Sequence, residues 1–303
     1  MRTRSSSLSK LPTRPQRAGI SLDRNNNAIR LDRQPRLIHN TSKHLNEGFF
    51  GASENIYHVD SRTALEKHYE IGAMIGRGNF SRVYFALRRK DEKKCALKEV
   101  LKQQLRGKWF FIENEVEILQ MCSHPNICKI VDAYKTNSKY LLVFEYAQNG
   151  DLFELIRRDG KLEESDAATF TSQTASALAY LHNRKIVHRD IKAENLLLYS
   201  KKQEFGQLGG PRKRYGLPVD IWSLGVLLHV MLVGFAPFRA SERDRLFRLI
   251  TQGRLYFGMP EWREISEKAR ELVSGMMCTN VEKRYTAGEV LLHPWIRQFD
   301  SII

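Results

Sequence analysis

The sequence has few cysteines and lacks an apolar run long enough to cross a membrane. Its four cysteines are scattered, with no Cys-x-x-Cys pair and no adjacent His, so reduced thiols are expected rather than a zinc site. The longest apolar run, residues 224–238, is shorter than the roughly 18 residues that a bilayer requires and contains His229. That run predicts a buried core helix, and no transmembrane segment is expected.

The N-terminal segment lacks acidic residues. There are none in the first 22 positions, and no apolar stretch of the kind found in secretory signals follows the basic residues. A mitochondrial transit peptide is disfavoured because Pro12 and Pro15 would interrupt its amphipathic helix. We therefore expect a cytoplasmic protein, with nuclear and cytoskeletal locations as alternatives.

The same segment is strongly basic. Residues 1–45 hold ten Lys or Arg against two Asp, which is about half of the net charge of +15. Residues 1–65 have no apolar periodicity, so we expect a disordered basic tail there. Such a tail attracts acidic partners, of which microtubules, anionic lipid and nucleic acid are the candidates. A solvated extension without a partner is the simpler alternative.

From Tyr69 the pattern changes to short β-rich runs separated by Gly-rich or charged turns. Strands are predicted at residues 69–76, 81–89, 93–100 and 140–146. Helices are predicted at residues 109–122 and 163–183, and nearly everything after Asp220 is also predicted to be helical. This order predicts an α+β fold with a strand-rich N-lobe, about 69–147, a helical C-lobe, about 148–296, and a cleft between them, followed by a short tail at 297–303.

A glycine-containing segment joins the first two predicted strands. Gly76 and Gly78 are expected in the turn, and Val83 follows. Glycines let a backbone approach a ligand and point N–H groups at phosphate oxygens, and Val83 could cover a flat base. Ser81 stands in place of a third glycine, and a hairpin without a ligand would look the same.

Lys98 ends the apolar stretch CALK of the third predicted strand, and Glu115 lies on the helix that follows. A lysine that faces a cleft is costly unless it is paired. A carboxylate on the next helix is the partner that would steer its ammonium group toward phosphates. An isolated pair of this kind would more often be two unrelated surface residues. Because the pair follows the glycine segment in this order, it favours a nucleotide site.

The most specific stretch is IVHRDIKAEN, residues 186–195. Asp190 can accept a proton from a hydroxyl group, and Lys192 can neutralise charge on a transferred phosphoryl group. Asn195 can offer an amide oxygen to Mg²⁺. A chance match of this length is very rare.

These motifs resemble those of the eukaryotic protein kinases over residues 69–296. The resemblance implies a two-lobed kinase fold that transfers the γ-phosphate of ATP, with Mg²⁺, to Ser or Thr hydroxyls. It implies Asp190 and Lys192 as catalytic residues, Asn195 as a metal ligand, Phe144 as the gatekeeper and Asp220 as a brace for the catalytic loop. The residues that it assigns to ATP binding are Ile75, Gly76, Gly78, Val83, Ala96, Lys98, Glu115, Glu145, Ala147 and Asp151.

Within the kinases, the stretches IENEVEIL, YGLPVDIW and HPWI resemble the calcium/calmodulin-dependent group, and most closely the doublecortin-like kinases. The microtubule-binding doublecortin modules of that family are not in this sequence, and no calmodulin-binding tail is evident after the kinase domain. No motif identifies the protein substrate.

One part of the kinase pattern is missing. The family places a short strand, Asp-Phe-Gly, the activation loop and Ala-Pro-Glu between the positions of Asn195 and Asp220, and usually has nearly twice as many residues there. Neither tripeptide occurs in this interval. Glu204-Phe205-Gly206 is one alternative to Asp-Phe-Gly, with Glu204 holding Mg²⁺. Its spacing favours the polar turn of a hairpin whose second strand begins at Gln207, with a deletion near residues 208–215.

Two functions therefore stay open. The first is an ATP-dependent serine/threonine kinase, as the resemblance implies. The second is a non-catalytic, pseudokinase-like module that binds nucleotide or acts as a scaffold, which the missing segment favours. Without the lost carboxylate, charge that develops on the transferred phosphoryl group is poorly compensated. Arg284, which in the family pairs with the Glu of Ala-Pro-Glu, is expected to be left as a buried charge without its partner.

Overall fold

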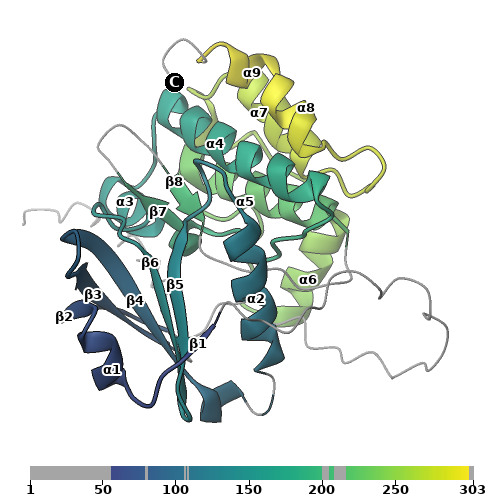
Figure 1. Ribbon diagram of the computed structural model, residues 1–303. Helices are drawn as coiled ribbons and strands as arrows, with labels where there is room; N and C mark the ends of the chain where they lie inside the picture. Colours follow the sequence, from purple (N-terminus) through teal and green to yellow (C-terminus); the bar gives the residue numbers. More distant parts are fainter. Residues whose placement is uncertain are drawn as a thin grey trace, which may run out of the picture. The chain divides into compact units, whose positions relative to one another are not determined.

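The computed structural model describes residues 56–78, 81–105, 107, 109–199, 205–207 and 216–299, and only the backbone of 205–207. These residues belong to one compact unit, Gly48–Ile303. Strands dominate its first part and helices its second, so the predicted two-lobed α+β arrangement is confirmed (Figure 1). No helix in the described part of the chain is long and apolar enough to span a membrane.

The N-lobe is built on a six-stranded sheet with the strand order β1-β5-β6-β4-β3-β2. Its strands are β1 Tyr57–His58, β2 Tyr69–Arg77, β3 Ser81–Arg88, β4 Lys93–Leu101, β5 Ile130–Lys135 and β6 Lys139–Glu145. All neighbours pair antiparallel except β1 and β5, which are parallel. The lobe also contains α1 Arg62–Glu66, the 3₁₀ turn η1 Lys102–Leu105 and α2 Phe110–Met121.

The two faces of this sheet lie in different hydrophobic clusters. Along β6, Tyr140, Leu142 and Phe144 belong to the cluster that contains α2 residues. Leu141 and Val143 belong to a second cluster on the opposite face. The alternation follows from the two-residue period of a strand, and it explains why β6 is a nearly continuous apolar run rather than an alternating one.

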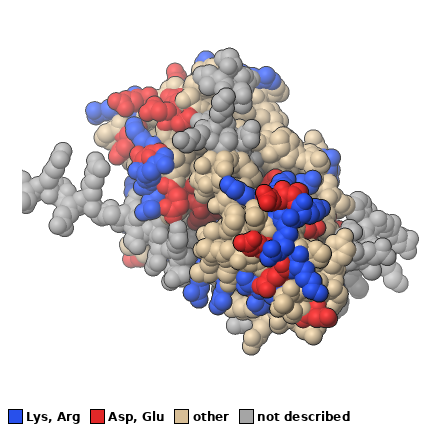
Figure 2. Space-filling model, turned by 60° about the vertical axis from the view of Figure 1, so that its left-hand side comes forward, with Lys and Arg blue, Asp and Glu red and all other residues tan. Residues whose placement is uncertain are grey.

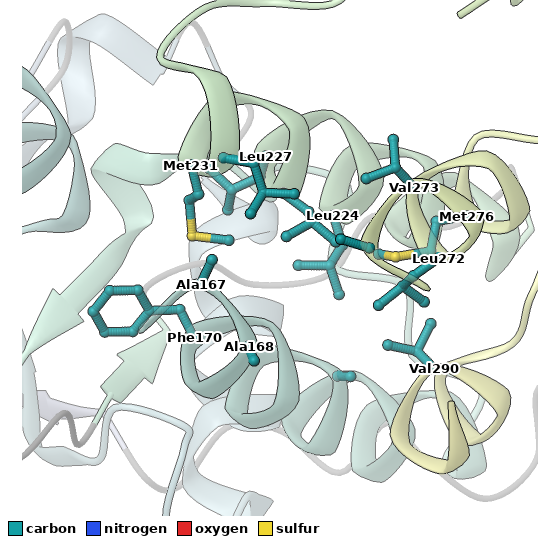
Figure 3. Packing of buried hydrophobic residues seen from close by; sticks show 14 of the residues in the cluster. Ala167, Ala168, Phe170, Leu224, Leu227, Met231, Leu272, Val273, Met276 and Val290 are labelled. Atoms are coloured by element: carbon teal, nitrogen blue, oxygen red, sulfur yellow. The ribbon is translucent and has the colours of Figure 1, made fainter. Parts of the chain in front are cut away.

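The C-lobe is mainly helical. Its helices are α3 Leu152–Asp159, α4 Glu164–Asn183, α5 Pro218–Val233, α6 Arg243–Gln252, α7 Glu267–Met276, α8 Ala287–Leu292 and α9 Pro294–Arg297, with 3₁₀ turns η2 Ala193–Asn195 and η3 Pro260–Trp262. Figure 3 shows side chains of α4, α5, α7 and α8 meeting in its core. The sequence around α5 is apolar on all sides because this helix is buried among the others.

Polar contacts join the two lobes at α4, the helix that precedes the catalytic loop, residues 186–195. The backbone amide of Ser123, just after α2, donates to the Tyr180 hydroxyl of α4 at 3.0 Å. The ring of His124 lies 3.2 Å, Nε2 to Oγ, from Ser176 of the same helix. The α2–β5 connection is therefore anchored on α4, the helix that leads into the catalytic loop.

The structure bears out most of the predicted elements and corrects the start of the fold. The four predicted strands and the helices at 109–122 and 163–183 are present as β2, β3, β4, β6, α2 and α4. The expectation of no fold before residue 65 is wrong, because β1 and α1 form there and bury Ile56 and Leu65. The segments 1–55 and 300–303 lie outside the described residues.

The predicted hairpin after the catalytic loop is also present. Strand β7, Leu196–Leu198, pairs antiparallel with β8, Phe205–Gln207. The second strand begins at Phe205 rather than Gln207, so the sequence placed its start two residues too late. Glu204 and the proposed deletion at 208–215 lie outside the described residues.

Charges of both signs are mixed on the surface that Figure 2 shows. Ion pairs such as Arg88–Asp91 and Arg158–Asp159 place a carboxylate directly beside a guanidinium group. Charges of opposite sign lie close together there, so the described residues of that face form no broad patch of one sign. The basic tail proposed to attract acidic partners, residues 1–45, lies outside the described residues.

Candidate active site

The catalytic-loop residues meet at one point. The Asn195 amide nitrogen donates to the Asp190 backbone carbonyl at 2.7 Å and to its carboxylate at 2.9 Å. The Lys192 ammonium lies 3.1 Å from the same carboxylate oxygen, Oδ2. The Asp190 side chain is 62% exposed, so a hydroxyl group can still reach it. The loop therefore presents an accessible carboxylate between a cation and an amide.

A buried carboxylate in α5 holds this loop in place. Asp220 is fully buried and accepts hydrogen bonds from the backbone amides of His188, at 2.8 Å, and Arg189, at 2.6 Å. The ring Nε2 of His182, at the end of α4, lies 3.0 Å from its Oδ2. These contacts compensate the cost of burying the charge, and the role predicted for Asp220 is supported by this geometry.

The backbone at Arg189 is strained. Its φ is +68°, in the left-handed region that side-chain-bearing residues seldom occupy. The two amides held by Asp220 flank the turn, and the Asp190 amide donates to the His188 ring Nδ1 at 3.3 Å. Strain of this kind persists when surrounding contacts fix it and is typical of functional loops.

His188 also fills the space beneath the loop. It is 3% exposed, and its ring Nε2 has no hydrogen-bond partner among the residues that the structure describes. Burial lowers the pKa of this imidazole, against the opposing influence of Asp220, Asp190 and Glu115. The ring is therefore neutral at physiological pH and acts as packing and as an acceptor for the Asp190 amide.

Lys98 lies in β4, opposite Val83 of β3 and Leu142 of β6. Glu115 lies in α2, the helix that shares a cluster with this face of the sheet. Both side chains are half-buried, and the ion pairs recorded among the described residues do not join them. Their pairing stays a prediction, which a nucleotide-bound state would have to show.

The glycine segment forms the end of the β2–β3 hairpin. Gly76 lies within β2, opposite Val83, rather than in the turn where the sequence placed it. The Gly78 amide donates to the Ser81 carbonyl at 2.9 Å. A Cβ atom on Gly78 would approach the Ser81 hydroxyl to 3.0 Å, so the residue keeps the hairpin end narrow. Ile75, also predicted to bind ATP, is 46% exposed beside it.

The predicted adenine-binding strand end is β6 and the residues after it. Phe144, the predicted gatekeeper, is buried and pairs with Ala96 of β4. The Glu145 carboxylate accepts the Lys129 amide at 2.8 Å, and the Glu145 amide donates to the Lys129 carbonyl at 3.1 Å, so both groups are used within the fold. Ala147 is half-buried in the connection that leads to α3.

Asp151, predicted near the ribose, is the N-cap of α3. Its side chain accepts the Glu154 amide at 2.9 Å. A cap of this kind satisfies one of the free N–H groups of the first helical turn. Asp151 therefore has a structural role that does not depend on nucleotide.

Metal binding is only partly provided for by the described residues. The Asn195 nitrogen donates to Asp190, so its amide oxygen is not the atom that this carboxylate engages, and an amide oxygen is a ligand type that Mg²⁺ accepts. Within the described part of the chain, no group of three or more His, Cys, Asp or Glu is arranged to hold a metal ion. The Asn195 oxygen fits a metal that gains its other ligands from phosphates and water.

Arg284 is not stranded, contrary to the sequence expectation. Its Nε donates to the Cys278 carbonyl at 2.8 Å and its Nη1 to the Pro218 carbonyl at 2.9 Å. The guanidinium also lies over the Trp222 ring, 4.9 Å from its centre. Two carbonyls and an aromatic face thus satisfy a cation that the family pairs with a carboxylate.

The sequence profile of the protein kinase domain matches residues 69–209 and 208–296. This chain belongs to the protein kinase family. It is 39% identical over 262 residues to serine/threonine-protein kinase DCLK3 of Mus musculus, covering 77% of this chain and 33% of that kinase. It is 41% identical over 267 residues to serine/threonine-protein kinase DCLK2 of Rattus norvegicus, covering 78% of this chain and 35% of that one.

Serine/threonine-protein kinase DCLK1 of Rattus norvegicus is 38% identical over 262 residues, with 77% of this chain and 60% of the relative covered. The chain thus spans between a third and three fifths of the length of these relatives. They bear out the predicted serine/threonine kinase family and its doublecortin-like group.

Sequence reasoning missed two supporting contacts of this kinase site. His182 braces Asp220 from the end of α4. The Tyr199 hydroxyl, just after β7, donates to the Cys128 sulfur at 3.0 Å. This contact links the β7–β8 hairpin to the N-lobe. Burial raises the pKa of the Cys128 thiol to about 12, so this contact holds an uncharged sulfur. Neither contact follows a sequence spacing, because each joins segments that only the fold brings together.

Proposed function

We propose that this chain binds ATP with Mg²⁺ and that its catalytic loop is arranged to transfer the γ-phosphate to a serine or threonine hydroxyl, at a rate reduced by its shortened activation segment. The observation that carries this proposal is the joint contact of Asp190, Lys192 and Asn195. Membership of the serine/threonine kinases makes phosphoryl transfer the chemistry that this constellation serves.

In this proposal each residue has a separate task. Asp190 accepts the proton of the incoming hydroxyl through its exposed carboxylate, and Lys192 offers a positive charge to the transferred group. Lys98 and the backbone amides of the glycine hairpin hold the phosphates, while the amide oxygen of Asn195 contributes to metal binding. Mg²⁺, when bound, neutralises the charge that develops on the phosphate oxygens.

The segment between Asn195 and Asp220 is the reason to expect a reduced rate of phosphate transfer. Glu204 is the only acidic residue between those two positions. The backbone of Phe205 and Gly206 is inside β8 and pairs with β7, whereas the family places its metal-binding motif after this strand. Removing one preorganised electrostatic contact from a transition state typically costs about 100-fold or more in kcat.

Two features of the comparisons support the loss of residues here. The kinase profile matches in two pieces that meet at residues 208 and 209. The alignment with the Mus musculus relative runs over 262 residues, more than the 77% of this 303-residue chain that takes part, so that relative has residues that this chain lacks. The break in the profile match supports a deletion near residues 208–215, and the alignment length supports a deletion without giving its position.

A non-catalytic nucleotide-binding module is the second candidate. It is favoured by the lack of both Asp-Phe-Gly and Ala-Pro-Glu from the sequence between Asn195 and Asp220. In that case the folded loop, the glycine hairpin and Lys98 would still bind nucleotide, and the protein would act as a scaffold or competitor. The two candidates differ only in turnover.

The test measures MgATP binding by calorimetry and phosphate transfer to a generic basic peptide. The variants are Asp190→Asn, Lys98→Met and Glu204→Gln, with Asp244→Asn, an exposed residue of α6, as the matched control. We expect the unmodified chain to bind MgATP and Lys98→Met to weaken that binding. We also expect slow phosphate transfer, which Asp190→Asn abolishes and Asp244→Asn leaves unchanged. Sensitivity to Glu204→Gln would assign the second metal contact to that residue.

Other outcomes separate the two candidates. Binding without any Asp190-dependent transfer would reject the catalytic proposal and establish the nucleotide-binding module. Absence of MgATP binding in a folded protein would reject both.

A further inference from the structure

Residues 56–66, here called the N-terminal clasp, precede the part of the chain that the kinase profile matches. The clasp begins at Ile56 in the cluster shared with α2 and ends in α1, whose Leu65 lies in the cluster on the opposite face of the sheet. Figure 1 shows α1 and α2 on opposite sides of the strands, with β1 at the sheet edge. One short segment therefore contacts both faces of the N-lobe sheet.

The α1 part of the clasp forms an ion pair with a buried carboxylate. The Glu99 side chain is 4% exposed, and its Oε1 lies 2.9 Å from Nη1 of Arg62. Its other oxygen lies 2.9 Å from the Lys139 ammonium. A buried carboxylate is costly unless it is paired, and Arg62 shares the neutralisation of Glu99 with Lys139.

Glu99 directly follows Lys98 in β4. Successive strand residues point to opposite faces, so Glu99 faces the clasp helix and Lys98 faces the side of α2. Arg62 is itself placed by its guanidinium, which lies over the Tyr84 ring at 4.7 Å. A shift of Arg62 therefore acts on the strand that carries the predicted phosphate-binding lysine.

The first residue of the clasp belongs to the same hydrophobic cluster as α2, the helix that carries Glu115. Ile56 is 5% exposed and shares its cluster with Val116 and Leu119 of α2. The β1 pairing fixes it there, with the Val59 amide donating to the Lys135 carbonyl at 3.0 Å and the Tyr57 ring 5.7 Å from that of Tyr134. Loss of Ile56 would leave a cavity in the cluster that includes these α2 residues.

We propose that the N-terminal clasp positions β4 and α2 relative to each other, with Ile56 and Arg62 as positioning residues for Lys98 and Glu115. The clasp joins the two elements from outside the kinase profile, so the segment leading into the kinase domain influences how the domain holds nucleotide. A segment that only stabilised the lobe would not discriminate between α2 and the other elements of the same lobe.

The first experiment measures amide hydrogen exchange in the full chain, without nucleotide. The variants are Ile56→Ala and Arg62→Gln, and the matched control is Arg158→Gln, which breaks an exposed Arg–Asp pair in the C-lobe. We expect exchange within residues 110–121 to accelerate about tenfold or more in Ile56→Ala, with β2 of the same lobe and α7 of the C-lobe unchanged. Unchanged α2 exchange in a folded Ile56→Ala protein would overturn the proposal. Should that variant fail to fold, Ile56→Val poses the same question.

A second comparison tests the charge pair. Arg62→Gln leaves Lys139 as the remaining cation of the Glu99 ion pairs. The double variant Arg62→Gln/Glu99→Gln removes the carboxylate as well, so it should recover most of the exchange protection that Arg62→Gln loses. Additive effects of the two substitutions would overturn the role of Arg62.

The nucleotide measurement rests on the proposed function. We expect Ile56→Ala to weaken MgATP binding several-fold in the otherwise unmodified chain and to have no further effect in the Lys98→Met background. Equal weakening in both backgrounds would reject positioning of Lys98. If the unmodified chain binds no MgATP, the proposed function fails, while the exchange experiment still decides whether the clasp positions α2.

Discussion

Asp220, in α5, accepts a hydrogen bond of 2.6 Å from the backbone amide of Arg189 in the catalytic loop. Arg189 has the strained φ of +68°, and the residue after it is the predicted catalytic base. The carboxylate stands 31 positions further along the chain, so the long, rigid core helix fixes the conformation of a short loop. The loop geometry thus depends on the packing of the C-lobe core.

The first prediction concerns this brace. Asp220→Asn replaces one acceptor oxygen by an NH₂ group that faces donors, and should lower the free energy of unfolding by about 2 kcal/mol. Urea denaturation measures the change, with Asp244→Asn, an exposed acid of α6, as control. If the two variants are equally stable, the brace contributes nothing to stability.

The second prediction concerns Arg284. Since two carbonyls and the Trp222 ring satisfy its guanidinium, Arg284→Met should destabilise the fold by about 1–3 kcal/mol. A cation stranded by a lost partner would give the opposite sign, because removing it would relieve an uncompensated charge. A rise in the thermal unfolding temperature of Arg284→Met would therefore support the stranded-charge view.

The main elements could be predicted because their patterns are long. Helix α4 and strand β6 carry many apolar residues at a regular period, which local sequence alone reveals. The two residues of β1 and the five of α1 carry no such period. They form because a finished sheet offers them an edge and a face, and that is a tertiary effect.

The site divides in the same way. Asp190, Lys192 and Asn195 lie within six positions, so one stretch of sequence was enough to identify all three. Lys98 and Glu115 sit on separate elements, and their distance depends on how α2 packs against the sheet. The carbonyls that satisfy Arg284 have no sequence signature, because any residue supplies a backbone oxygen.

The third prediction compares two glycines of the C-lobe. A Cβ atom on Gly275 would lie 2.2 Å from the Tyr285 ring, whereas at Gly288 the nearest atom is 3.9 Å away. Gly275→Ala should cost about 1–3 kcal/mol through overpacking. Gly288→Ala in α8 should stabilise the protein by about 0.5–1 kcal/mol, because alanine favours the helix. Chemical denaturation of both variants checks this, and stabilisation by both would show that the Tyr285 ring moves aside freely.

The fourth prediction is a pH dependence that arises from His229 in α5. This side chain is 3% exposed, packs against Trp262, and lies 2.9 Å, Nδ1 to O, from the Phe235 carbonyl. Burial lowers its pKa to about 4, and nearby Arg239 acts in the same direction. An unfolded chain holds this histidine near its ordinary pKa of about 6.5 and so binds the proton first.

The sign follows from that difference. As pH falls from 7 to 5, protonation of the unfolded state should remove about 2 kcal/mol of stability through His229 alone. The His229→Gln variant, which keeps a donor for the Phe235 carbonyl, should lose that much less over the same interval. Urea denaturation of both proteins at pH 7 and pH 5 isolates the term, because carboxylates and other histidines contribute equally to both. Parallel losses in the two proteins would mean that the buried ring is not the group that titrates.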